Sequence, residues 1–271
     1  MNDMSYINYG KEKLLAAPKI PLIVMETDKD IFKAMADEMV EIINRNNDSG
    51  TPSVFIVPVG PTGQYPYFVE RINREQISLK DTWFINMDEY LTEDDEWISE
   101  DHFMSFRGFM NREVYGKISK ELLMDEKQRV FPDPRDLGNV ERVIDQLGKI
   151  DAVFGGIGIN GHVAFNEADP LMTEEEFMNL PTRVTDISLE TRVVNSLDTM
   201  HGAFYAMPKR CVTVGFKDML RADAIRLGVF RPWHKSVIRT AAYGEKGSWF
   251  PVSILRSHKD ISIRLPESVA L

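Results

Sequence analysis

Short apolar runs alternate along the chain with segments of helical periodicity. The runs are rich in β-branched and aromatic residues and lie at 20–25, 54–59, 82–87, 152–157, 211–216, 225–230 and 261–263. Apolar residues spaced three and four apart predict a helix from about Asp28 into the polar stretch 44–50, and further helices over 65–75, 101–115, 140–147 and 235–242. This alternation is typical of βαβ units. We therefore predict an α/β, Rossmann-like three-layer fold with a mainly parallel sheet and helices on both faces.

The length of 271 residues fits one large α/β domain better than two complete domains. We therefore treat 1–271 as a single domain. The segment 168–190 is acidic and irregular in its apolar pattern, and we expect it to form a small lid, either as a loop or as a partly helical segment.

Charge and cysteine content exclude several classes of protein. A formal net charge of −10 without a clustered basic patch disfavours binding to nucleic acid and to anionic membrane surfaces. No apolar run approaches the roughly 18 residues that a bilayer-spanning helix needs. One cysteine, Cys211, cannot form an intrachain disulfide, and the first fifteen residues lack the apolar core of a signal peptide. We expect a cytoplasmic protein, and the composition is compatible with a homo-oligomer.

Ligands of open α/β sheets bind beyond the carboxyl ends of the strands, so we expect the ligand-binding residues to follow the runs directly. The second run is followed by a glycine-bearing turn made of Gly60, Pro61, Thr62 and Gly63. Free backbone N–H groups in such a turn can bind an anion, although Pro61 supplies none. A tight strand-to-helix connection explains the turn equally well.

Two adjacent carboxylates, Asp88 and Glu89, follow the third run. Successive side chains of an extended segment point in opposite directions, so we expect one of the two to face the ligand crevice. A carboxylate in a cleft can act as a general base. The alternative is a solvated acidic turn, because residues 93–96 continue the negative charge.

A glycine-rich loop follows the fourth run and leads to His162 and Glu167, which together can exchange protons near neutral pH. A dinucleotide site is disfavoured because the glycines do not follow the first strand with the required spacing, so we expect no cofactor. Spacings typical of metal ligands are absent, so we expect no metal. Arg192 and Lys235 follow later and are candidates for binding an anionic group, although each alone is more simply a surface charge.

Five blocks resemble the glucosamine-6-phosphate deaminase and isomerase family, whose superfamily includes the 6-phosphogluconolactonases. They are FINMDEYL (84–91), GGIGINGHVAFNE (155–167), TRVVNS (191–196), TVG (213–215) and PVSILRSH (251–258). The resemblance extends from about residue 20 to the end, and its first two blocks are specific for the deaminases.

The resemblance implies conversion of an amino-sugar phosphate to a ketose phosphate with release of ammonia. It implies that Asp88 moves a proton between C2 and C1 of the open-chain sugar, and that His162, oriented by Glu167, assists ring opening. Asn160 takes a catalytic position of the family. The implied substrate-binding residues are Gly60, Pro61, Thr62, Gly63, Glu89, Gly161, Arg192 and Lys235.

Two positions depart from the family pattern. Asn160 stands where the family carries an aspartate, and Pro61 stands where the anion loop normally has a small hydroxyl residue or glycine. A neutral Asn160 cannot stabilise an imidazolium by charge. Three alternatives therefore stay open: an isomerase that does not release ammonia, a 6-phosphogluconolactonase-like hydrolase, and a catalytically inactive sugar-phosphate sensor.

Overall fold

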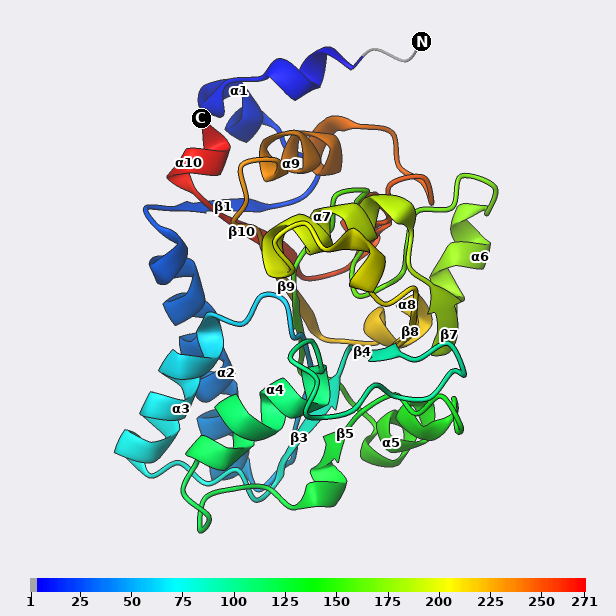
Figure 1. Cartoon of the computed structure of the whole chain (residues 1–271). Helices are drawn as coiled ribbons and strands as arrows, with labels where there is room; N and C mark the ends of the chain where they lie inside the picture. The colour runs from blue at the N-terminus through cyan, green and yellow to red at the C-terminus, as the bar shows by residue number, and fades with distance from the viewer. Residues whose placement is uncertain (1–3) are drawn as a thin grey trace.

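A parallel sheet runs through the protein, and its strand order confirms the predicted α/β class. The computed structural model describes residues 4–271, apart from the side chains of residues 198 and 199. Within this part of the chain, every neighbouring pair of strands in the larger sheet is parallel. Its seven strands, in spatial order, are β1 (Leu22–Met25), β10 (Ile261–Pro266), β9 (Ala224–Gly228), β6 (Ala152–Gly155), β2 (Ser53–Val57), β3 (Thr82–Asn86) and β5 (Arg129–Val130) (Figure 1).

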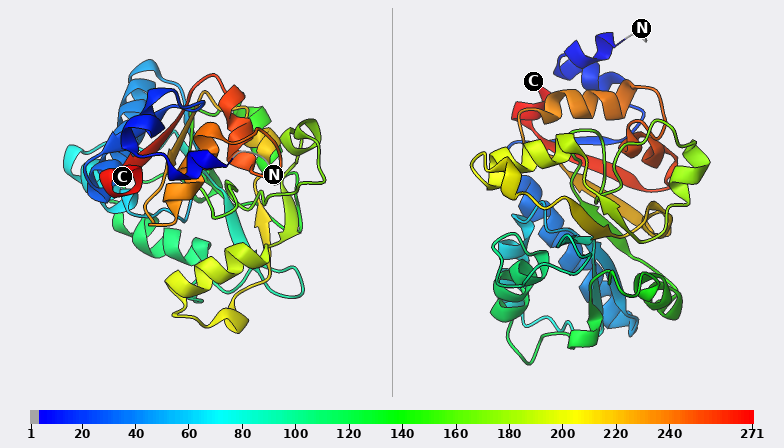
Figure 2. Two further views of the ribbon diagram at one scale, coloured as in Figure 1. Left: turned by 90° about the horizontal axis from the view of Figure 1, so that it is seen from above. Right: turned by 45° about the vertical axis from the view of Figure 1, so that its right-hand side comes forward.

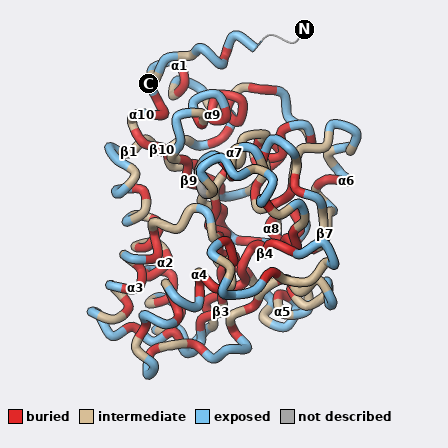
Figure 3. Tube along the Cα trace, in the orientation of Figure 1, coloured by how far each residue is buried: buried red, intermediate tan, exposed pale blue. Residues whose placement is uncertain are grey.

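Helices cover both faces of this sheet, as the burial of every residue of β2 requires. Val54 and Ile56 point into one hydrophobic cluster, whereas Phe55 and Val57 point into another. The first cluster includes side chains of α5 (Asn139–Leu147) and α9 (His234–Tyr243), and the second includes those of α2 (Asp28–Ser49), α3 (Gln64–Glu75) and α4 (Phe106–Glu113). Buried segments accordingly run through the centre of the trace, with exposed backbone at its rim (Figure 3). The protein therefore has the predicted three layers.

Shorter elements complete the chain. They are η1 (Ser5–Asn8), α1 (Lys11–Ala16), η2 (Tyr115–Lys117), η3 (Glu126–Gln128), α6 (Glu174–Met178), α7 (Leu189–Thr199), η4 (Phe204–Ala206), α8 (Phe216–Met219), η5 (Pro251–Ser257) and α10 (Glu267–Ala270). The helices α1 and α10 lie at the same end of the molecule, where Lys11 and Glu267 form an ion pair of 2.5 Å (Figure 2). No helix within residues 4–271 has the length and apolar character to cross a membrane.

A second, antiparallel sheet differs from the sequence expectation. It is formed by β4 (Asp88–Leu91), β8 (Arg210–Thr213) and β7 (Arg183–Asp186), with β8 in the middle. We expected the run 211–216 to join the parallel sheet. That expectation is wrong because the run is buried by pairing with β4 and β7 instead, and a short apolar strand has the same composition in either sheet.

The best-defined helix boundaries follow from capping. Thr27, one residue before the expected start, is the N-cap of α2 and forms a reciprocal capping box with Asp30. Gly50 ends the helix in the left-handed conformation, with φ of 66°. The segment 168–190 contains α6 and β7, and its role as a lid stays a prediction.

Candidate active site

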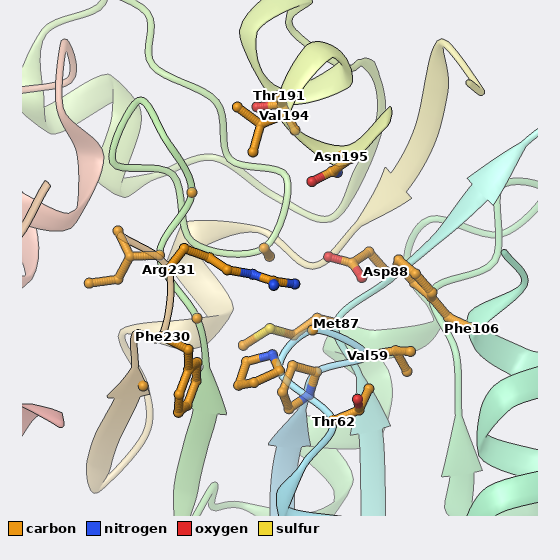
Figure 4. Close-up of a pocket in the computed structure, with 18 of the residues that line it drawn as sticks. Val59, Thr62, Met87, Asp88, Phe106, Thr191, Val194, Asn195, Phe230 and Arg231 are labelled. Carbon is orange, nitrogen blue, oxygen red and sulfur yellow. The ribbon is translucent and has the colours of Figure 1, made fainter. Parts of the chain in front are cut away.

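A cavity of about 700 Å³ lies at the carboxyl ends of the parallel strands. The loops after β2, β6 and β9 line it on one side, and the start of β4 and part of α7 line it on the other (Figure 4). The second sheet thus closes a crevice that the first sheet opens. A ligand of sugar size can lie between them.

The loop after β2 forms the cavity wall with the four residues that the sequence singles out. These are Gly60, Pro61, Thr62 and Gly63, of which Gly60 has φ of 147° and is joined to Pro61 by a cis peptide bond. The hydroxyl of Tyr65 donates a hydrogen bond of 2.5 Å to the carbonyl of Pro58 and fixes the start of the loop. A Cβ on Gly156 would lie 3.1 Å from the Pro61 ring, so the loop after β6 packs closely against this loop.

Asp88 is the first residue of β4, pairs with Thr213 of β8 and lines the cavity (Figure 4). Asp88 is buried, with 7 % of its surface exposed. Burial raises the pKa of the Asp88 carboxyl well above its ordinary value, and the neighbouring charge of Glu89 raises it further. A carboxyl group in this environment can both take up and release a proton.

Glu89 points away from the cavity, as strand alternation requires. Its carboxylate accepts hydrogen bonds from the hydroxyl of Ser105 at 2.9 Å and from the backbone N–H groups of Phe106 at 3.0 Å and Arg107 at 2.8 Å. Burial raises the pKa of Glu89, while these hydrogen bonds lower it. The structure therefore places Glu89 as an anchor for the start of α4 and not beside a ligand.

His162 lines the cavity, and its Nδ1 atom faces a group of polar partners. It lies 3.0 Å from Oε2 of Glu167, 2.8 Å from Oδ1 of Asn160 and 3.2 Å from the hydroxyl of Thr191. The amide of Asn160 donates a hydrogen bond of 2.7 Å to Oε2 of Glu167, so Asn160 bridges the pair without contributing charge. Nε2 is the nitrogen that this arrangement leaves for proton exchange.

Close packing of glycines fixes the imidazole. A Cβ on Gly158 would overlap the ring of His162. Gly161 has φ of 82°, and a Cβ at this position would lie 2.8 Å from the ring of Phe250. Gly161 does not line the cavity. Its carbonyl accepts a hydrogen bond of 2.8 Å from the backbone of Val252. We infer that Gly161 shapes the loop that carries His162.

Asn166 ties the same loop to the second sheet. Its buried amide donates hydrogen bonds of 3.0 Å to the carbonyls of Val163 and Val214, and its oxygen accepts one of 2.7 Å from Arg183 of β7. The positions of His162 and Glu167 therefore depend on both sheets.

The Glu167 carboxyl is buried, which by itself would raise its pKa. The charge of His162 and the hydrogen bonds from His162, Asn160 and Thr191 outweigh burial and lower the pKa of Glu167 to about 2. Because the folded pKa lies below the ordinary value, the carboxylate stabilises the fold above about pH 4.5, and this contribution is lost as the pH falls toward 2.

We expect Glu167→Gln to lack this pH-dependent contribution to stability. The free energy of unfolding of the wild type should fall between pH 5 and pH 2 by up to about 3 kcal/mol more than that of the variant. Urea unfolding at several pH values measures this difference. Glu190→Gln, at an exposed glutamate of α7, is the control. Parallel pH profiles for the wild type and Glu167→Gln would contradict the assignment.

The helix α7 supplies cavity residues that the sequence analysis missed. Thr191, Val194 and Asn195 line the cavity from its upper side in Figure 4. Ser188 caps the helix by accepting a hydrogen bond from the backbone of Thr191, and its own backbone N–H contacts Glu167 at 3.3 Å. The serine N-cap was a signal that could have located this helix.

The two predicted basic residues lie outside the cavity. Arg192 is on α7, and its guanidinium lies over the ring of Phe204 at 4.7 Å. Lys235 is exposed at the start of α9. Among the described residues that line the cavity, Arg231 is the one lysine or arginine, and its side chain extends into the cavity (Figure 4). Within residues 4–271, no group of three or more His, Cys, Asp or Glu side chains is arranged to hold a metal.

No family model matches the chain. Full-length relatives are nevertheless found by sequence. The chain is 26% identical over 259 residues to a glucosamine-6-phosphate deaminase of Clostridium perfringens, covering 92% of this chain and 98% of the relative. It is 27% identical over 261 residues to the glucosamine-6-phosphate deaminase of Porphyromonas gingivalis, covering 92% of each.

Solved structures share the fold. A monomeric glucosamine-6-phosphate deaminase superposes with a TM-score of 0.79 at 22% identity, covering 93% of this chain and 99% of the other. The 6-phosphogluconolactonase of Trypanosoma brucei superposes with a TM-score of 0.64 at 18% identity, covering 94% and 98%. The chain therefore has the α/β fold that these two solved enzymes share. In sequence, the chain is similar over 92% of its length to curated glucosamine-6-phosphate deaminases, at 26% and 27% identity.

Proposed function

We propose that the protein is an aldose–ketose isomerase and deaminase that converts glucosamine 6-phosphate, or a related amino-sugar phosphate, to a ketose phosphate and ammonia. The observation that carries the proposal is the buried carboxyl of Asp88 in a cavity that His162 also lines, with Glu167 in contact with His162 outside the lining. Proton transfer next to a carbonyl needs one base that both accepts and returns a proton, and a second group that opens the sugar ring.

The proposed reaction needs these groups and one water molecule. His162 exchanges a proton with the ring oxygen and releases the open-chain aldose. Asp88 takes the proton from C2 and returns it to C1, while a second proton moves from the amine nitrogen to O1. The aldehyde thereby becomes a hydroxymethyl group, and the amine becomes an imine at C2. Water adds to the imine carbon, and ammonia leaves. Glu167 holds His162 in orientation through Nδ1 and leaves Nε2 to exchange the proton.

A second candidate is an isomerase without deaminase activity, which acts on a neutral sugar phosphate or on a sugar with another anionic group. Asn160 supports it, because a neutral amide occupies the position between His162 and Glu167 where the resembled family carries a carboxylate. A site with one negative charge fewer gives less stabilisation to a departing ammonium ion.

One assay separates the two candidates. The purified protein is incubated with glucosamine 6-phosphate, galactosamine 6-phosphate and the corresponding neutral hexose phosphates, and ketose and ammonia are measured independently. The proposed function predicts equimolar ketose phosphate and ammonia from an amino sugar. Ketose formation from a neutral sugar without ammonia from either amino sugar would favour the second candidate. Turnover of none of these substrates would overturn both.

A further inference from the structure

We propose that Arg231 binds the anionic group of the substrate, in place of Lys235. The inference rests on the proposed function, which requires an anchor for a sugar phosphate dianion. Arg231 is the one basic lysine or arginine side chain among the described residues that line the cavity, whereas Lys235 lies outside it. The resemblance alone assigned the anion to Lys235 and Arg192, and the geometry assigns it to a different residue.

The position of Arg231 fits an anchor at the far side of the cavity from the base. It lies between β9 and α9, and its guanidinium extends from this side into the space that Asp88 borders from the second sheet (Figure 4). A guanidinium presents several N–H groups in one plane and can bind two phosphate oxygens at once. A sugar held at this end can present its C1–C2 end to Asp88.

His234 holds the backbone that carries Arg231. Its Nδ1 atom accepts hydrogen bonds from the backbone N–H groups of Arg231 at 2.8 Å and Phe230 at 3.3 Å. The other ring nitrogen lies 2.9 Å from the carbonyl of Ile157 in the loop after β6. Since Nδ1 accepts, Nε2 carries the proton and donates to that carbonyl. The neutral ring therefore joins two cavity loops and fixes the main chain of Arg231 before a ligand binds.

Aromatic side chains surround this end of the cavity. The ring of Trp233 lies 3.8 Å from that of His234, and the rings of Phe230 and Phe32 stack at 4.4 Å. Phe32, Phe230 and Trp233 all line the cavity. Arg231 itself is exposed, but a ligand that fills the cavity beside these rings excludes water from this end and so strengthens each charge-assisted hydrogen bond.

The loss of a donor at Pro61 fits the same assignment. A phosphate bound at the loop 60–63 lacks the backbone N–H that another residue at position 61 would supply. A guanidinium on the facing loop provides N–H groups that compensate for it.

Binding of glucosamine 6-phosphate in the Asp88→Asn background tests the proposal, because the ligand is then not consumed. Titration calorimetry should show that Arg231→Ala raises the Kd by about 10- to 100-fold, as expected for hydrogen bonds to a charged group. The Kd of Arg231→Lys should lie between those of the parent protein and Arg231→Ala. Inorganic phosphate should compete with the sugar phosphate in the parent protein and less well in Arg231→Ala.

Two comparison variants make the test specific. Arg45→Ala removes an exposed arginine of α2 and should leave the Kd unchanged. Lys235→Ala separates the two assignments, because a larger increase in Kd than for Arg231→Ala would overturn the proposal. An unchanged Kd in Arg231→Ala with native thermal unfolding would overturn it as well. If sugar phosphate binding depends on Arg231 but the wild type turns over no substrate, the proposed function fails and this inference stands.

Discussion

Asp88→Asn is expected to lower kcat for ketose formation by about a thousandfold, the scale of a lost general base, while the affinity for glucosamine 6-phosphate survives. The amide has the shape of the carboxyl group but cannot accept the C2 proton. The side chain stays buried at the start of β4, so the fold should be unchanged. Steady-state rates and calorimetric binding together measure the two quantities.

Asp94→Asn is the matched control, because Asp94 is an exposed aspartate in the turn that follows β4. Its kcat should equal that of the wild type. Full turnover in Asp88→Asn would show that another group moves the proton. In the wild type, kcat/KM should fall as the pH drops through the raised pKa of Asp88, so the acid limb lies at higher pH than for an ordinary aspartate.

His162→Asn should lower kcat/KM by about a hundredfold through slower ring opening. The shorter amide leaves Glu167 and Thr191 without their contact to Nδ1 and puts no proton donor where Nε2 stood. Initial rates with glucosamine 6-phosphate measure the loss. His201→Asn, at an exposed histidine with φ of 51°, a conformation that asparagine adopts readily, should have no effect.

The outcome that contradicts this assignment is selective loss of substrate affinity. If His162→Asn raised the Kd for the sugar phosphate without changing kcat, the histidine would bind substrate and not exchange protons. Measuring both quantities on one preparation separates the two roles.

The parallel sheet could be predicted from sequence because each strand is a short apolar run bounded by polar residues. β5 and β7 escaped because one has two residues and the other, Arg183–Asp186, is polar and half-buried. β4 was treated as an extended continuation of the third run and not as a strand of a second sheet, because its Asp and Glu are unusual in a strand that is buried on both faces. In each case the pairing partner, not the composition, determines the strand.

The site also contains residues that could be predicted from sequence and residues that could not. The loop 60–63, Asp88 and the His162–Glu167 pair follow strand ends closely in sequence, so sequence reasoning placed them at one edge of the sheet. The structure brings the loop, Asp88 and His162 into one cavity, and Glu167 contacts His162. Basic residues were harder to assign. Arg231 and Lys235 are four residues apart, and which one enters the cavity depends on how His234 folds the backbone between them. That hydrogen bond has no sequence signature.

One residue, Met87, separates β3 of the parallel sheet from β4 of the antiparallel sheet. The first residue of the second sheet is Asp88, while Arg231 belongs to a loop of the first. A substrate that contacts both residues connects the two sheets, and its binding free energy opposes their separation. Occupancy of the cavity by the sugar phosphate should therefore make the two sheets unfold as one cooperative unit.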